Sequence, residues 1–121
     1  MKSKPAGKIL LSPRFRITCG KEIAFGPGKA ELLQLVAETG SIGKAASRMK
    51  MSYMRAWSLI RTMNGCFKEP LVLAKHGGEG GGGAELTETG RAVVTHYRGM
   101  EHACQRATAA HWNQLRRLLR S

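Results

Sequence analysis

Six of the seven residues at positions 77–83 are glycine, and the seventh is Glu79. Glycine loses more conformational freedom on folding than any other residue, so neither a helix nor a strand is expected to run through this segment. The residues before it, LVLAK at 71–75, are mostly apolar, and ELT follows at 85–87. The sequence therefore predicts two short strands joined by a glycine loop.

The residues before this hairpin predict two short helices joined by a three-residue turn. Ser41 is the expected N-cap of the first helix, and Ser52 is the expected N-cap of the second, which ends near residue 67. In the turn, a left-handed backbone at Lys50 would cost about 1 kcal/mol, because the residue is not glycine. Apolar stripes follow the inner faces of both helices: Ile42, Ala45, Ala46 and Met49, then Ala56, Ile60, Met63 and Phe67. This order of elements predicts a helix-turn-helix followed by a wing.

Three further segments complete the predicted fold. Apolar residues alternate with other residues in RFRITCGKEIAFG at 14–26, which predicts a β-hairpin that turns at Gly20. A helix is expected over 28–38, and a much longer one from Thr87 to about residue 119. We therefore predict a mainly α fold with small β: a winged helix-turn-helix with an N-terminal β-hairpin and a long C-terminal helix.

The charge of the chain indicates the class of its partner. Twenty Lys and Arg residues stand against eight Glu and no Asp, which gives a formal net charge of +12. A protein tolerates the resulting self-repulsion when its partner is a polyanion. Residues 39–68 contain six basic residues and no acid. We therefore predict a nucleic-acid-binding surface on this segment; the alternative is a solvated face on a generally basic chain.

The helix that begins after Ser52 is the expected reader of double-stranded DNA. The Ser52 hydroxyl and nearby N–H groups are suited to a phosphate, whereas arginine is the commonest reader of guanine in the major groove. We assign Tyr53 to DNA contact and Trp57 to packing against the wing, with base contact as the alternative for Trp57. The glycines of the wing allow its backbone to approach the sugar-phosphate chain; a connector without DNA contact is the alternative. The predicted DNA-binding residues are Lys44, Ser52, Tyr53, Met54, Arg55, Ser58, Arg61, Lys75, His76, Gly78 and Gly80.

Other kinds of chemistry find little support in the sequence. The chain has no Asp, and the glycine tract does not end in the Gly-Lys-Ser/Thr of a phosphate-binding loop, so we do not predict an enzyme. Three histidines of the long helix lack the i, i+4 spacing of metal ligands, so we predict no metal and no cofactor. The three widely spaced cysteines are typical of reduced thiols, and no apolar run is long enough to cross a bilayer, which predicts a cytoplasmic protein.

The predicted C-terminal helix is longer than a single domain of this size needs. Apolar residues recur along it at spacings of three and four, and an exposed stripe of this kind normally marks an interface. We predict a homodimer through this helix, with two recognition helices about 34 Å apart on a palindromic site. The alternative is that the helix folds back on its own wing domain. The predicted dimerisation residues are Val93, Tyr97, Met100, Cys104, Ala107, Leu115 and Leu118.

Two stretches, GSIGKAASRMKMSYMRAWSLIRTMN and LVLAKHGGEGGGGAELTETG, resemble the N-terminal DNA-binding domain of the ModE family of molybdate-responsive bacterial regulators. The specific features are Ser52-Tyr53, Ala56-Trp57, Met63-Asn64 and the glycine wing. LysR-type regulators share the general frame but not the Tyr/Trp pair or the wing. The resemblance covers about residues 14–118 and implies operator binding by a winged helix that dimerises through its last helix.

These expectations divide the chain into a flexible basic leader (1–13), a DNA-binding domain (14–87) and a dimerisation helix (88–121). Because the sequence ends at residue 121, we expect the molybdate-binding domains of the ModE family to be absent and molybdate not to bind. The expected function is that of a sequence-specific transcriptional regulator of repressor type. The alternative is a basic architectural protein that coats DNA or RNA without reading bases.

Overall fold

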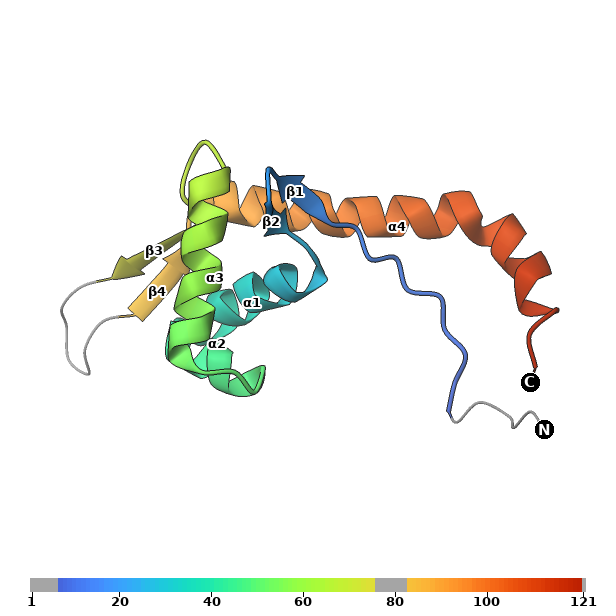
Figure 1. Cartoon of the computed structure of the whole chain (residues 1–121), viewed down its shortest axis with the longest axis horizontal. Helices are drawn as coiled ribbons and strands as arrows, with labels where there is room; N and C mark the ends of the chain where they lie inside the picture. Colours follow the sequence, from blue (N-terminus) through green and yellow to red (C-terminus); the bar gives the residue numbers. More distant parts are fainter. Residues whose placement is uncertain (1–6, 76–82, 121) are drawn as a thin grey trace.

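The computed structural model describes residues 7–75 and 83–120. Its elements are β1 (Ile17–Cys19), β2 (Glu22–Phe25), α1 (Pro27–Thr39), α2 (Ile42–Arg48), α3 (Tyr53–Cys66), β3 (Val72–Lys75), β4 (Gly83–Leu86) and α4 (Glu88–Arg116). The strands form two antiparallel hairpins, β1–β2 and β3–β4. Figure 1 shows α1, α2 and α3 gathered at one end of the molecule, with α4 extending away from them. The predicted mainly helical, winged helix-turn-helix fold is confirmed.

The predicted helix caps account for where α2 and α3 begin. The Ser41 hydroxyl accepts a hydrogen bond from the backbone N–H of Lys44 at 3.1 Å, and the Ser52 hydroxyl accepts one from that of Arg55 at 3.1 Å. Each cap satisfies a backbone donor that the first turn of a helix leaves free. Between the helices, Lys50 adopts a φ of 58°, the left-handed conformation considered for this turn.

The core lies where α1, α2 and α3 meet. The inner stripe of α3, Ala56, Ile60 and Met63, is fully buried, and Ala45 and Ala46 of α2 are buried opposite it. Small side chains on α2 permit the close approach of the two helices. Trp57 is half-buried against this core, which agrees with a packing role for its indole ring.

A junction at Leu71 joins the end of α3 to the wing. The Asn64 side chain accepts a hydrogen bond from the Leu71 N–H at 2.8 Å and donates one to the Val72 carbonyl at 3.1 Å. Because the Leu71 side chain is itself fully buried, these bonds replace water that its backbone cannot reach. Asn64 therefore fixes the direction in which the chain leaves α3.

The same junction holds the start of α4. The Thr87 N–H donates to the Leu71 carbonyl at 2.9 Å, and the Thr87 hydroxyl donates to the Pro70 carbonyl at 2.7 Å. That hydroxyl also caps α4 by accepting from the Gly90 N–H at 2.9 Å. Gly90 is buried against Leu71 so closely that an added Cβ would overlap the Leu71 carbonyl oxygen. We call Asn64, Pro70–Val72, Thr87 and Gly90 the Leu71 junction.

The wing strands pair in register from Val72 opposite Leu86 to Lys75 opposite Gly83. The Ala84 N–H donates to the Gly40 carbonyl at 2.9 Å, so β4 also rests on the end of α1. The wing tip between Lys75 and Gly83 falls outside the described residues, and with it the predicted DNA contacts His76, Gly78 and Gly80.

The structure corrects the predicted dimerisation face at its N-terminal end. Tyr97 is only 2% exposed, because its ring packs edge-on against Phe25 and its hydroxyl donates to the Phe15 carbonyl at 2.8 Å. Val93 is partly buried against the same core. Both residues therefore belong to the core of their own domain, as in the alternative of a helix that folds back. Further along, α4 ends at Arg116, so the predicted interface residue Leu118 lies beyond the helix.

The described part of the leader lies near the long C-terminal helix. Residues 7–13 form no regular element but follow the C-terminal half of α4 (Figure 1). Leu11 and Pro13 line a groove together with Cys104 and Leu115 of α4. The basic charge of the leader does not predict this path. Its apolar residues ILL at 9–11, which interrupt the basic residues, are the part of the leader suited to packing beside α4.

The backbone of Lys50 predicts a gain in stability on substitution by glycine. Lys50→Gly should raise the free energy of unfolding by up to about 1 kcal/mol, because glycine adopts a positive φ without the Cβ clash. Lys50→Ala serves as the control, since it removes the same charge and retains the clash. Equal urea-unfolding midpoints for the two variants would contradict the prediction.

Two glycines of α4 should respond oppositely to alanine. Gly90→Ala should destabilise the fold by about 1–3 kcal/mol, because the methyl group forces Leu71 away from Thr87. No atom outside its own neighbourhood lies within 4 Å of a Cβ at Gly99, so Gly99→Ala should stabilise the helix by about 1 kcal/mol. Thermal unfolding measures both effects; a neutral Gly90→Ala would show that the junction yields easily.

Candidate nucleic-acid interface

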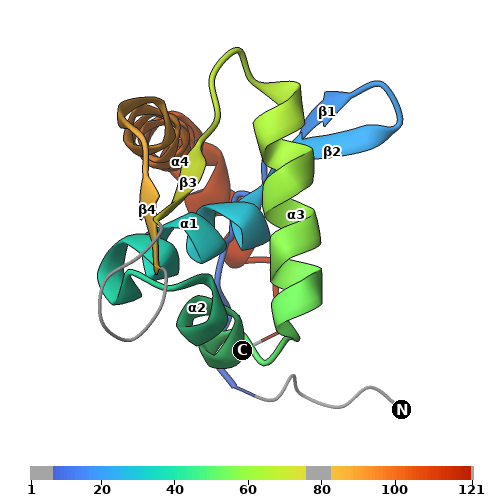
Figure 2. The same ribbon diagram turned by 90° about the vertical axis from the view of Figure 1, so that its left-hand side faces the viewer.

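Helical spacing gives α3 a continuous exposed face. Since Ala56, Ile60 and Met63 point into the core, the opposite side of the helix presents Met54, Ser58 and Arg61 to solvent. Met54 is 70% exposed, so this face presents an apolar group beside the serine hydroxyl and the arginine. In Figure 2, α1, α2 and the wing strands lie on one side of α3, and the β1–β2 hairpin lies on the other near its C-terminal end.

The two flanks of this exposed face lead to different elements. Asn64 points toward the wing, as its bonds to β3 require, and Trp57 shares this side by helical spacing. Arg55 and Leu59 lie on the opposite flank, where they line a hollow beside the hairpin. Tyr53 is 53% exposed at the N-terminal end of α3, and its ring lies beside Gly43 of α2.

The cationic residues of the predicted DNA-binding set differ in whether they already form an ion pair with a carboxylate. Lys75 of β3 lies 3.3 Å from Glu85 of β4, so the wing strand carries a cross-strand ion pair. Both side chains are more than half exposed, which makes the pair worth less than about 1 kcal/mol and easily exchanged for a phosphate. In the described residues Arg55 and Arg61 have no carboxylate within 4 Å, and neither has Lys44.

The structure thus unites most of the predicted site and separates a smaller part. Ser52 and the five residues predicted on α3 occupy one exposed helix, and Lys44 stands at the start of the neighbouring α2. Lys75 belongs to a different surface, the wing, which the Leu71 junction holds beside α3. All of the predicted residues in the described range are exposed; His76, Gly78 and Gly80 lie outside that range.

Three cations near α3 were absent from the predicted site. Arg14, Arg16 and Lys29 line the hollow that Arg55 also lines. The alternating segment RFRI at residues 14–17 indicates that two of these cations share a face, because alternation in a strand places Arg14 and Arg16 on the face opposite Phe15. Sequence alone does not show that this face adjoins α3, since the two segments are about 40 residues apart.

Metal-binding and membrane-spanning elements find no support in residues 7–75 and 83–120. These residues contain no group of three or more His, Cys, Asp or Glu placed to hold a metal ion. Desolvation raises the pKa of the Cys66 thiol, and a hydrogen bond with the Cys19 thiol raises it further, so Cys66 stays protonated at neutral pH. None of the helices in the described ranges is long and apolar enough to span a membrane.

Comparisons with known proteins agree with this geometry. Residues 28–91, slightly more than half of the chain, match the lysR family of bacterial regulatory helix-turn-helix proteins. The chain is 42% identical over 84 residues to the molybdenum transport protein ModE of Azotobacter vinelandii, covering 69% of this chain and 31% of that protein. It is 38% identical over 82 residues to the molybdenum-pterin-binding protein MopA of Rhodobacter capsulatus, covering 68% of this chain and 31% of the relative.

A third relative carries a more specific name. The DNA-binding transcriptional dual regulator ModE of Escherichia coli K12 is 39% identical over 71 residues, which cover 59% of this chain and 27% of the relative. The chain therefore spans less than a third of the length of these relatives.

Proposed function

The chain belongs to the lysR family of bacterial regulatory helix-turn-helix proteins, and we propose that it binds a specific sequence in duplex DNA as a homodimer and regulates transcription there. Its similarity to ModE proteins identifies the DNA-binding domain as ModE-like. The dimer, the palindromic site and a repressing action are parts of this proposal.

One observation above all supports sequence-specific binding. The exposed face of α3 combines serine and an exposed methionine with two arginines that have no carboxylate partner in the described residues. No acidic residue occurs in the sequence from 39 to 68. Hydrogen-bonding and apolar groups on one helix match the donors, acceptors and thymine methyl groups of the major groove. A purely electrostatic surface would need the cations but neither Met54 nor Tyr53.

The proposed DNA-binding residues divide into those that contact base edges and those that contact backbone phosphates. Arg55 and Tyr53 stand near the N-terminal end of α3, the part of a recognition helix that contacts base edges. Lys44 and Lys75 lie on the neighbouring α2 and β3, where they are suited to backbone phosphates. Ser52 is committed to the cap of α3, so it offers a phosphate mainly the N–H groups of the first turn.

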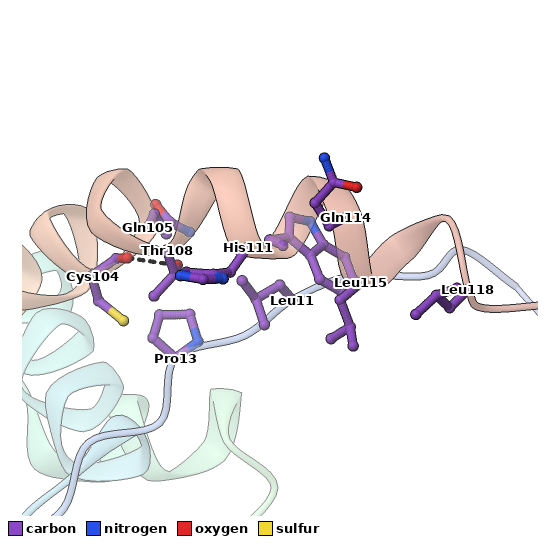
Figure 3. Close-up of a pocket in the computed structure, with 10 residues that line it drawn as sticks. Leu11, Pro13, Cys104, Gln105, Thr108, His111, Gln114, Leu115 and Leu118 are labelled. Carbon is purple, nitrogen blue, oxygen red and sulfur yellow. Dashed lines mark hydrogen bonds between the residues drawn. The ribbon is translucent and has the colours of Figure 1, made fainter.

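The C-terminal half of α4 supplies a surface for a second copy. Beyond Tyr97 the helix leaves its own domain, and Met100 and Leu115 are 43% and 54% exposed. Cys104 and Leu115 face Leu11 across an open groove of about 450 Å³, and Figure 3 shows these side chains with Leu118 beyond the helix end. We propose that a partner copy covers this groove, because a soluble monomer rarely exposes so continuous an apolar surface.

A two-fold axis at this surface would set the form of the DNA site. Two identical winged helices joined through α4 would place their recognition helices in successive major grooves about 34 Å apart. The site would then be a palindrome, because the symmetry of the dimer is repeated in the bases it reads. A regulator that occupies such a site in the cytoplasm and excludes polymerase would act as a repressor.

An architectural protein that coats DNA or RNA is the second candidate, supported by the net charge of +12. The two functions differ in how affinity depends on sequence. A reader should lose several kcal/mol when its site is scrambled at fixed salt, whereas a coating protein should lose almost nothing. The exposed Met54 and Tyr53 favour the reader. The molybdenum chemistry in the relatives' names refers to proteins more than three times as long as the matched segment, and we assign none of it to these residues.

Replacing Arg55 should affect sequence preference as well as affinity. Arg55→Ala should cost roughly 1–3 kcal/mol on a site selected from random duplexes and relax the preference at one base pair. Lys44→Ala is the matched control and should weaken the selected and scrambled duplexes by the same factor. Fluorescence anisotropy at fixed salt measures both; uniform weakening by Arg55→Ala would make Arg55 a phosphate contact.

Charge placed on the apolar face of α4 should separate the dimer. Met100→Glu combined with Cys104→Glu should yield monomers by sedimentation, because pairing would bury two unpaired carboxylates in each copy. Ala110→Glu adds one such carboxylate to an exposed position of α4 outside the groove and should leave the dimer intact. An unmodified protein that sediments as a monomer at micromolar concentration would exclude this dimer and its palindromic site.

A further inference from the structure

The hollow beside α3 gathers four cations from three parts of the fold. Arg14 and Arg16 come from the segment that leads into β1, Lys29 from the first turn of α1, and Arg55 from α3. Its volume is about 310 Å³, and Met49, Met51 and Leu59 line its apolar part. The hollow lies on the flank of α3 opposite to Asn64 and the wing.

The backbone that carries Arg14 and Arg16 is held in place by contacts with the core. Phe15, which stands between Arg14 and Arg16, packs partly against the core, and its carbonyl accepts the hydrogen bond from the buried Tyr97 hydroxyl. The aliphatic stem of Arg16 lies close to Gly26, where an added Cβ would be 3.6 Å from Arg16 Cγ. The arginines are thus held at one side of α3 rather than on a loose arm.

Nothing in the described residues neutralises this cluster by direct pairing. The three ion pairs found there involve Arg48, Lys75 and Arg98, and none involves a cation of the hollow. The pKa of Lys29 is lowered, chiefly by partial burial; the nearby Glu22 carboxylate opposes this shift, and the positive charge of Arg55 adds to it. The first turn of α1 contains no acidic side chain, and Gly26 provides no side-chain cap. Like charges held together at a cost indicate an anionic partner.

We propose that Arg14, Arg16 and Lys29 bind backbone phosphates of duplex DNA, on the side of the recognition helix opposite to the wing. This proposal rests on the function proposed above and extends its surface to the β1–β2 hairpin. With Lys75 on the wing and these cations on the hairpin, the two strands that border the major groove are held on both sides of α3. In this arrangement Arg55 lies between the phosphate-binding cations of the hollow and the bases contacted by α3.

The geometry favours DNA over a small phosphate ligand. The hollow is open, and Arg55 and Leu59 of α3 line it, so a duplex lying on α3 would pass over it. Because phosphate contacts are indifferent to sequence, the three cations should contribute affinity and alignment but no base preference. Their removal should therefore change the salt dependence of binding, which reports the number of phosphates neutralised.

The test compares glutamine variants of the three cations singly and together. Each substitution should reduce the slope of log K against log salt by about 0.9 for each phosphate that is no longer neutralised, so the triple variant should reduce it by up to about 2.7. Its affinity should fall at least about tenfold for the selected and the scrambled duplex alike. Lys21→Gln is the matched control, because Lys21 is exposed on the same hairpin but does not line the hollow; its slope should equal that of the unmodified protein.

The possible outcomes separate this inference from the proposed function. If the unmodified protein binds its selected site with a steep slope and the single and triple variants match Lys21→Gln, the hairpin contact is wrong while the proposed function stands. If the unmodified protein shows no preference for any duplex, the proposed function fails. Inorganic phosphate is titrated separately by phosphorus NMR at constant ionic strength. Saturable binding of phosphate, with a DNA slope unaffected by the triple substitution, would assign the hollow to a free anion and overturn the proposal.

Discussion

The backbone at Leu71 is the point on which the arrangement of the protein depends. Its N–H is bound by the Asn64 side chain at the end of α3, and its carbonyl is bound by Thr87 at the start of α4. Gly90 packs directly against the same carbonyl, where a larger side chain would not fit. A buried peptide group must keep its hydrogen bonds, so the recognition helix, the wing and the long helix share one rigid frame. Base reading by α3 and assembly through α4 are therefore geometrically coupled.

The distribution of charge follows from the same frame. Two of the ion pairs in the described residues lie away from the exposed face of α3, Arg98 with Glu101 and Arg48 with Glu38. On and beside the exposed face of α3, Lys44, Arg55 and Arg61 have no carboxylate within ion-pair distance in the described residues, whereas Lys75 of the wing pairs with Glu85. Such a surface is unfavourable in isolation and becomes favourable when a polyanion releases its counterions. These cations thus strengthen the binding of a polyanion but destabilise the free protein by their mutual repulsion. The buried apolar core supplies the stability of the fold.

Local signals in the sequence predicted most of the elements. Hydroxyl caps at Ser41, Ser52 and Thr87 fixed three helix starts, because each side chain bonds a backbone N–H only three residues away. What the sequence could not show were contacts between distant segments. Tyr97 has the spacing of an interface residue, yet its hydroxyl reaches the carbonyl of Phe15 across the domain. Arg14, Arg16 and Lys29 were missed for the same reason. The period of a helix or strand shows which residues share a face of that element, but not which other element lies beside that face.

A rigid path from α3 through the Leu71 junction to α4 should set the distance between the two recognition helices of the proposed dimer. Spin labels at Ser58→Cys in both copies, with the three native cysteines replaced by serine, measure that distance directly by pulsed electron resonance. We predict a single narrow distribution centred near 34 Å, roughly one turn of DNA, before any DNA is added. A broad distribution, or no distance between copies, would contradict the rigid path and the dimer that depends on it.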